Sequence, residues 1–169
     1  QVFNLSHATL DPDVLRFLPD TLVELSLNEV ESVGQDARFM TNLIEALLPF
    51  LHLKKLHLLF HRMTDREMIK LSQMAELMEL DLRGNTIGQM GIQSLAQLTG
   101  LTHLNLSCNE IQDAVMSDIV LMKRLQVLNL SANQIGDDGV EPLAQMKQLT
   151  YLNLSHNRIH ASGAAHLAQ

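Results

Sequence analysis

The sequence has a single cysteine, no tryptophan and few aromatic side chains of any kind. Cys108 cannot form a disulfide within the chain, so a reducing compartment is compatible with the composition. Aromatic residues make up 4% of the 169 residues, whereas hydrophobic residues make up 46%. The interior must therefore be built from Leu, Ile, Val and Met.

Positive charge is also scarce, and long apolar runs are absent. Twelve Lys and Arg stand against 19 Asp and Glu, which gives a formal net charge of −7. Nucleic acids and anionic membranes both require clustered basic residues. No apolar stretch approaches the roughly 20 residues that a membrane-spanning helix needs. We therefore expect neither nucleic-acid binding nor membrane insertion.

One repeated frame, LxxLxLxxNxI, dominates the sequence. Four copies follow one another at intervals of 24 residues, and two weaker copies and a strand-like fragment precede them. A unit this short cannot bury its own apolar face, so such units must stack into a solenoid. We expect about seven strands, which fall within 2–6, 22–30, 53–63, 77–87, 101–111, 125–135 and 149–159.

The apolar period changes within each unit. The Leu-x-Leu alternation of the frame predicts a short strand with one buried face. Between frames, apolar residues recur three apart, as in Ile92, Leu95 and Leu98, which predicts a short helix. Asp11 before Pro12 is typical of the start of a helix, and Pro142 predicts a helix start close to residues 138–141.

One unit breaks the period. Leu22 and Leu53 are 31 residues apart, and the surplus lies in residues 31–52. Phe39, Leu43, Ala46 and Leu47 predict a longer helix there. An insertion of this kind in a repeat array is either a neutral change or part of a binding surface.

These frames resemble those of leucine-rich-repeat (LRR) proteins, over nearly the whole chain. A G-x-x-x-L-A core in the helical segments further resembles the 24-residue GALA-type repeats of bacterial effectors, although the unit at 111–124 departs from it, with Val115 in place of glycine. The resemblance implies an α/β horseshoe-shaped solenoid, with parallel strands on its concave face and short helices on its convex face. The core matches at Gly91, Leu95 and Ala96, at Gly139, Leu143 and Ala144, and at Gly163, Leu167 and Ala168.

The resemblance also implies that the asparagine of each frame turns inward. A buried carboxamide is costly unless its donors and acceptor are satisfied, and the backbone of neighbouring turns can satisfy them. We therefore expect a structural asparagine ladder at Asn85, Asn109, Asn133 and Asn157. His61 takes the place of the asparagine one unit earlier.

If the leucines point inward, the residues between them line the concave face in columns. The central units carry a charged and apolar patch there, which is typical of a binding surface with an apolar centre and a polar rim. Phe60 alternatively folds inward, because its unit lacks the asparagine, and Tyr151 is a plausible second anchor. The predicted partner-binding residues are Lys55, His57, Leu59, Phe60, Glu79, Asp81, Arg83, His103 and Tyr151.

Nothing in the sequence predicts catalysis, a metal or a cofactor. The eight histidines lack the spacing of a closed zinc site. Cys108 lies near His103 and Asn109, but it has none of the sequence context of a thiol nucleophile.

We therefore expect residues 1–169 to form one LRR domain, part of a longer chain, that binds another protein through its concave face. The partner is either a host protein or a second bacterial effector whose active site is covered. The alternatives are the substrate-recognition repeats of a ubiquitin-ligase adaptor and a regulator of GTPases. We expect a protein that is monomeric apart from its partner and that acts in the cytosol, including that of a host cell after bacterial secretion.

Overall fold

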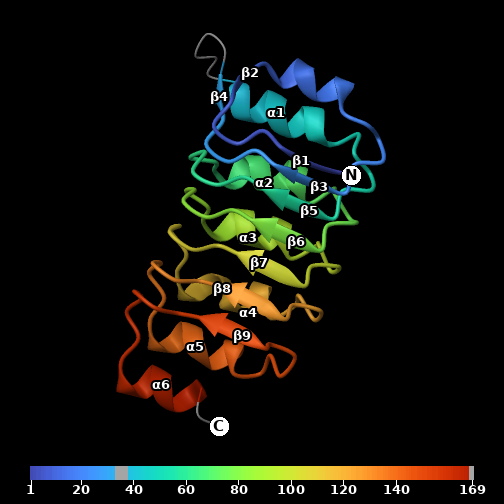
Figure 1. Ribbon diagram of the computed structural model, residues 1–169. Helices are drawn as coiled ribbons and strands as arrows, with labels where there is room; N and C mark the ends of the chain where they lie inside the picture. Colours follow the sequence, from blue (N-terminus) through green and yellow to red (C-terminus); the bar gives the residue numbers. More distant parts are fainter. Residues whose placement is uncertain (33–37, 168–169) are drawn as a thin grey trace.

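The computed structural model describes residues 1–32 and 38–167. Seven short parallel strands form a single sheet in chain order, which confirms the predicted solenoid and its seven strands (Figure 1). Each strand covers three residues of one unit. The strands are β1 (Val2–Asn4), β3 (Glu24–Ser26), β5 (Lys55–His57), β6 (Glu79–Asp81), β7 (His103–Asn105), β8 (Val127–Asn129) and β9 (Tyr151–Asn153).

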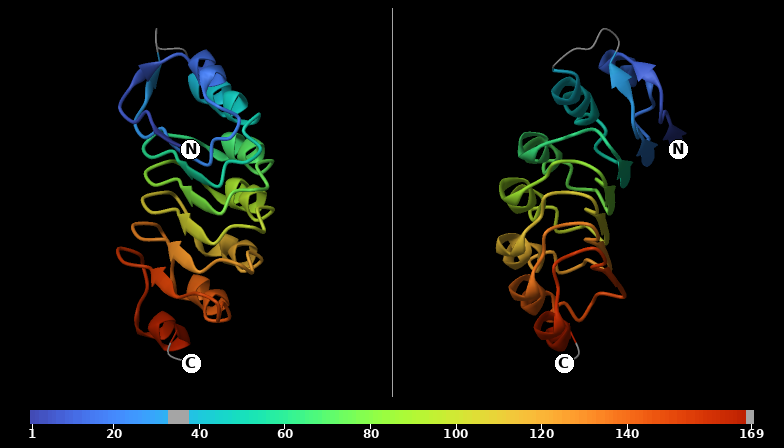
Figure 2. Two further views of the ribbon diagram at one scale, coloured as in Figure 1. Left: turned by 45° about the vertical axis from the view of Figure 1, so that its right-hand side comes forward. Right: turned by 90° about the vertical axis from the view of Figure 1, so that its left-hand side faces the viewer.

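The helices all lie on the side opposite the sheet (Figure 2). Neighbouring parallel strands are about 4.8 Å apart, whereas helices need about 10 Å, so the stack must curve with its strands inside. The helical segments are η1 (Pro12–Phe17), α1 (Phe39–Leu47), α2 (Asp65–Leu71), α3 (Gln89–Leu95), η2 (Asp113–Val115), α4 (Met116–Ile119), α5 (Asp137–Leu143) and α6 (Ala161–Leu167). Among the described residues, no helix is long and apolar enough to cross a membrane.

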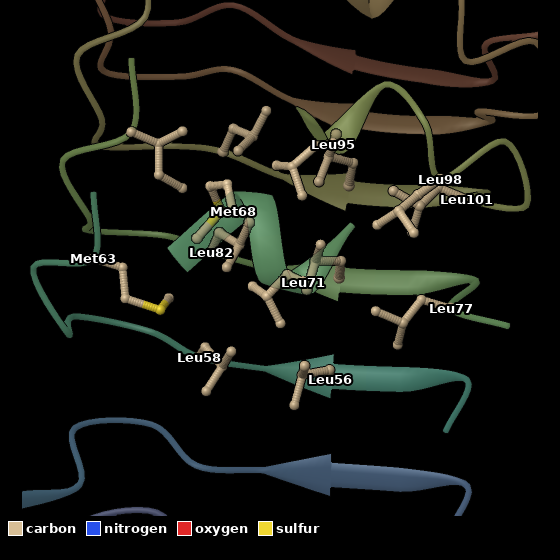
Figure 3. Packing of buried hydrophobic residues seen from close by; sticks show 14 of the residues in the cluster. Leu56, Leu58, Met63, Met68, Leu71, Leu77, Leu82, Leu95, Leu98 and Leu101 are labelled. Carbon is tan, nitrogen blue, oxygen red and sulfur yellow. The ribbon is translucent and has the colours of Figure 1, made fainter. Parts of the chain in front are cut away.

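The core lies between the two layers. Leu56 of β5 and Leu82, which follows β6, point toward helix residues such as Met68 and Leu71, and all four are fully buried (Figure 3). Met63 fills the last frame position of its unit and is likewise buried. Because every unit contributes the same positions, the core is continuous along the stack.

The long unit carries a longer helix, as predicted. Helix α1 has nine residues, against seven in α2, α3, α5 and α6, and it buries Phe39, Leu43 and Leu47. Two further strands have two residues each. Strand β2 (Thr9–Leu10), just before η1, pairs in parallel with β4 (Glu31–Ser32), which lies in the long unit. The predicted surplus includes residues 33–37, which lie outside the described residues.

Helix α5 begins at Asp137, one residue before the range in which Pro142 predicted the helix start. Pro142 itself is the sixth of its seven residues and lies near its end. A proline removes only one backbone donor, and a helix of seven residues loses little by that. Asp11, in contrast, begins η1 as predicted, and its side chain accepts a hydrogen bond from the backbone of Asp13 at 2.9 Å.

The glycines of the helical segments are explained by close packing. Gly91 and Gly139 leave room for an aspartate of the preceding unit: a Cβ at Gly139 would lie 2.4 Å from Oδ1 of Asp113, and one at Gly91 would lie 2.6 Å from Oδ1 of Asp65. Where Gln89 replaces the aspartate, the following unit carries Val115 instead of glycine. That unit begins with the 3₁₀ turn η2 in place of a regular first helical turn. Ala168, the last residue of the predicted G-x-x-x-L-A core, lies outside the described residues.

Candidate functional site: the concave face

The sheet register places the predicted surface residues in columns. Lys55, Glu79 and His103 are direct partners on adjacent strands, and the same column continues through Val127 to Tyr151. A second column runs parallel to it, two residues further along each strand. Its members are Asn4, Ser26, His57, Asp81, Asn105, Asn129 and Asn153.

The four frame asparagines connect the units below this face. Asn109 donates from Nδ2 to the carbonyls of Leu82 and Leu106, both at 3.1 Å, and its Oδ1 accepts from the backbone of Ile87 at 3.0 Å. Asn85, Asn133 and Asn157 make the equivalent bonds in their own units. These bonds hold consecutive turns at a fixed spacing and so keep the surface columns in register.

His61 fills the asparagine position one unit earlier. Its Nε2 contacts the carbonyl oxygen of Leu27, the third leucine of the preceding frame, as Asn85 contacts that of Leu58. Burial lowers the pKa of His61, partly offset by that carbonyl and by Glu29. A neutral imidazole with its proton on Nε2 therefore replaces the asparagine at this turn.

A polar network occupies the N-terminal half of the predicted patch. Nζ of Lys55 lies 3.0 Å from Oε2 of Glu79, and Nε2 of His57 lies 3.3 Å from Oε1 of the same carboxylate. The other ring nitrogen of His57 lies 3.0 Å from Oγ of Ser26. Partial burial of Glu79 opposes its ionisation, but the hydrogen bonds and charges of Lys55 and His57 outweigh it and lower the pKa of the carboxyl. Glu79 in turn raises the pKa of Lys55.

Asp81, on the next column, has different partners. Its Oδ1 accepts from the backbone of Arg83 at 3.0 Å, and its Oδ2 accepts from Nδ2 of Asn105 at 3.0 Å. Both donors are neutral. The ion pairs found among residues 1–32 and 38–167 include none to Asp81.

The Arg83 side chain instead lies over the Phe60 ring, 5.4 Å from its centroid. Phe60 does not fold inward: 44% of its surface is exposed, and its ring covers the backbone of Gly84 in the next unit. Leu59 differs from the expectation that it is exposed, because it is half-buried. Phe60 and Arg83 thus form a pair at the C-terminal edge of the strands.

The turn after the strands has a feature that the sequence analysis missed. The residue three positions after each member of the second column has a positive φ in all seven units. Only Gly84 is a glycine, and the others pay a conformational cost to hold the left-handed turn. The series is His7, Glu29, Phe60, Gly84, Cys108, Ala132 and His156. A signal was available, since all seven occupy one position of the frame, but six of them lack the residue type that reveals such a turn.

A shallow hollow of about 200 Å³ lies on the concave face across β6, β7, β8 and β9. It includes four of the predicted residues and leaves Lys55, His57, Leu59, Phe60 and Arg83 outside. Tyr151 is 51% exposed at its end. Asn105, Val127 and Asn129 also line the hollow but were not in the predicted patch. The two asparagines were left out because asparagine at these positions is an ordinary residue of a strand in this repeat. The lining residues are Glu79, Leu80, Asp81, His103, Leu104, Asn105, Val127, Asn129 and Tyr151.

Comparison with known proteins agrees with this geometry. Two family models, both described as leucine-rich repeat, match residues 75–135 and 146–168. The chain has the leucine-rich-repeat solenoid fold, and these two segments match the repeat in sequence. No curated protein sequence matches it significantly.

Solved structures share the leucine-rich-repeat fold. An internalin (InlF) of Listeria monocytogenes has a TM-score of 0.69 and 26% identity, with 94% of this chain and 48% of the internalin covered. Internalin C2 of the same species has a TM-score of 0.63 and 26% identity, with 86% and 57% covered. The ectodomain of the plant receptor kinase GASSHO1/SCHENGEN3 from Arabidopsis thaliana, in complex with Casparian strip integrity factor 2, has a TM-score of 0.59 and 20% identity, with 98% and 26% covered. The chain thus spans about half the length of the two internalins.

The leucine-rich repeats offer little that resembles a metal or thiol site. Within the described part of the chain, no three His, Cys, Asp or Glu side chains lie close enough together to hold a metal ion. Cys108 is half-buried at one of the left-handed turns. Its environment is therefore that of a turn residue in a repeated scaffold.

Proposed function

We propose that these repeats are a protein-binding module that captures a folded partner on the concave face and acts by binding, without catalysis. The observation that carries the proposal is the hollow across β6 to β9, which combines a carboxylate of Asp81, the imidazole of His103 and the exposed ring of Tyr151. Aromatic anchors among polar groups dominate the energetics of protein interfaces. The pair of Phe60 and Arg83 extends this surface along the strand ends.

We further propose a bacterial, effector-like role with 24-residue GALA-type repeats. The similarity to two Listeria internalins supports a bacterial source, and the spacing of Gly91 and Gly139 with their helix leucines supports the repeat type. The partner is a host protein met in the host cytosol, or a second effector that the module inhibits by covering its active site. The GASSHO1/SCHENGEN3 ectodomain, solved in complex with its factor, is a precedent for ligand capture by this fold.

The experiment compares two surfaces of one scaffold. Immobilised wild-type protein, the concave variant His103→Glu/Tyr151→Ala and the convex variant Gln145→Ala/Lys147→Ala are each incubated with lysates of the source bacterium and of host cells. All four altered side chains are exposed. The circular dichroism spectra of both variants should therefore match that of the wild type. We expect the wild type and the convex variant to capture the same partner. The concave variant should capture at least tenfold less of it. Equal capture by the concave variant would place binding elsewhere.

A further inference from the structure

We propose that the hollow receives an extended segment of the partner protein that carries an arginine or lysine, and that Asp81 pairs with this cation. The inference rests on the proposed function, because it assumes that the concave face binds a protein. It adds the chemical class of the segment and the residue that selects it. Three independent features of the surface lead to it.

The first feature is the column in which Asp81 lies. Four of its members, Asn4, Asn105, Asn129 and Asn153, accept a hydrogen bond through Oδ1 from the backbone two residues later, at 3.0 to 3.1 Å. Asp81 makes the same bond to Arg83. The turn therefore needs only the oxygen, which asparagine supplies as well. The negative charge of Asp81 has no part in holding the turn.

The second feature is that this charge is not balanced from within the described chain. Glu79 on the same strand pairs with Lys55 and His57, so its charge is already compensated. His57, opposite Asp81 on β5, contacts Glu79 and Ser26 instead, and the guanidinium of Arg83 lies over Phe60. Asp81 is held in a fixed orientation by Arg83 N and Asn105 Nδ2, at the edge of a hollow. A half-buried carboxylate in this state is preorganised for a cation from outside.

The third feature is the shape of the hollow. It crosses four strands, and three spacings of about 4.8 Å amount to about 14 Å. An extended peptide advances about 3.3 Å per residue, so about four steps, or five residues, span the hollow. Asp81 lies at one end and the aliphatic and aromatic surfaces of Val127 and Tyr151 at the other. Side chains of an extended segment alternate between two faces, so an even number of steps keeps its first and last side chains on the same face. The matching segment therefore has a basic residue and an apolar residue separated by three small ones.

The test uses blocked pentapeptides on the intact protein. Acetyl-Arg-Ala-Ala-Ala-Leu-amide and acetyl-Leu-Ala-Ala-Ala-Arg-amide, which cover both chain directions, are titrated into the ¹⁵N-labelled protein and followed by NMR. Each has a control in which citrulline, a neutral isostere, replaces arginine. We expect one arginine peptide to shift resonances of β6 to β9, and its citrulline form to bind roughly three- to tenfold more weakly, as for a partly exposed charge pair.

The protein variants provide the second arm. Asp81→Asn places in this column the residue that four other units already carry, so it should fold normally. We expect it to bind the arginine and citrulline peptides equally. Glu141→Gln on α5 changes the net charge by the same amount away from the hollow, and it should keep the arginine preference. Raising the salt concentration should lower the affinity of the arginine peptide and leave that of the citrulline peptide unchanged.

Three outcomes would overturn the inference. They are equal binding of the arginine and citrulline peptides to the wild type, resonance shifts confined to the helices, and no binding of either peptide. The wild-type comparison does not depend on the folding of any variant. If the partner is still lost from the His103→Glu/Tyr151→Ala variant in those cases, the proposed function stands and only the basic segment is wrong.

Discussion

The ring of Phe60 occupies the space in which a side chain at Gly84 would lie. A Cβ at Gly84 would be 2.1 Å from Cδ1 of Phe60, and Gly84 also has a φ of +70°. The two residues hold the same position of consecutive units, so the aromatic residue of one unit requires the glycine of the next. The exposed pair of Phe60 and Arg83 at the concave edge therefore depends on the absence of a side chain at Gly84.

Gly84→Ala should consequently destabilise the protein by about 1–3 kcal/mol, through the left-handed backbone and the displaced ring. Phe60→Ala in the same chain should restore part of this loss, and chemical denaturation of the four proteins in the cycle measures the coupling. Ala132 already occupies the equivalent backbone conformation. Additive losses would show that the ring moves aside without cost.

A second coupled pair links helices of adjacent units. Oδ1 of Asp113 accepts from the backbone of Gly136 at 2.6 Å and lies where a Cβ of Gly139 would be. Gly139→Ala should cost about 1–3 kcal/mol by overpacking. It should cost less in an Asp113→Ala background, where the carboxylate is gone, although the contact with Ile135 remains. Thermal unfolding of both single variants and the double variant measures this, and an equal cost in both backgrounds would contradict it.

His61 should make stability depend on pH. Because its folded-state pKa is lowered, the unfolded chain binds more protons than the folded one near and below the ordinary histidine pKa of about 6.5. Stability is therefore lost as the pH falls through that value. His61→Asn should flatten the change in unfolding free energy between about pH 7.5 and pH 5.5. It should also raise stability at neutral pH by about 0.5–1.5 kcal/mol, because an asparagine can bond two carbonyls.

The matched control for this measurement is His103→Asn, which removes an exposed histidine. Its pH profile should follow the wild type more closely than that of His61→Asn. If both variants change the profile equally, the dependence does not arise from the buried position.

The asparagine ladder should be costly to interrupt. Asn109→Ala removes both donors and leaves the buried backbone N–H of Ile87 without its acceptor. Each unsatisfied buried group costs about 1–3 kcal/mol, so we expect a loss of roughly 2–5 kcal/mol in chemical denaturation. Asn129→Ala on the half-exposed concave column should cost less than about 1.5 kcal/mol. Similar losses of unfolding free energy at Asn109 and Asn129 would show that the ladder stabilises the fold no more than the surface column does.

The sequence alone determined the architecture. A constant interval of 24 residues brings equal frame positions of successive units side by side, and this does not depend on the other residues of each unit. The columns through Glu79 and His103, and through Asp81 and Asn105, followed from that spacing, and the strand register confirms them. The longer helix of the 31-residue unit also followed from its apolar period. Pro142 predicted the start of its helix to within one residue, although it lies near the end of that helix, because the rule that confines proline to helix starts weakens in a helix of seven residues.

Only the tertiary structure decided how neighbouring side chains share the concave face. Arg83 could have paired with Asp81, but it lies over Phe60, and Lys55 balances Glu79. Such choices depend on side-chain directions and distances of a few ångströms, which a one-dimensional pattern does not contain. The hollow between Asp81 and Tyr151, and the carboxylate left open at its edge, arise from those choices.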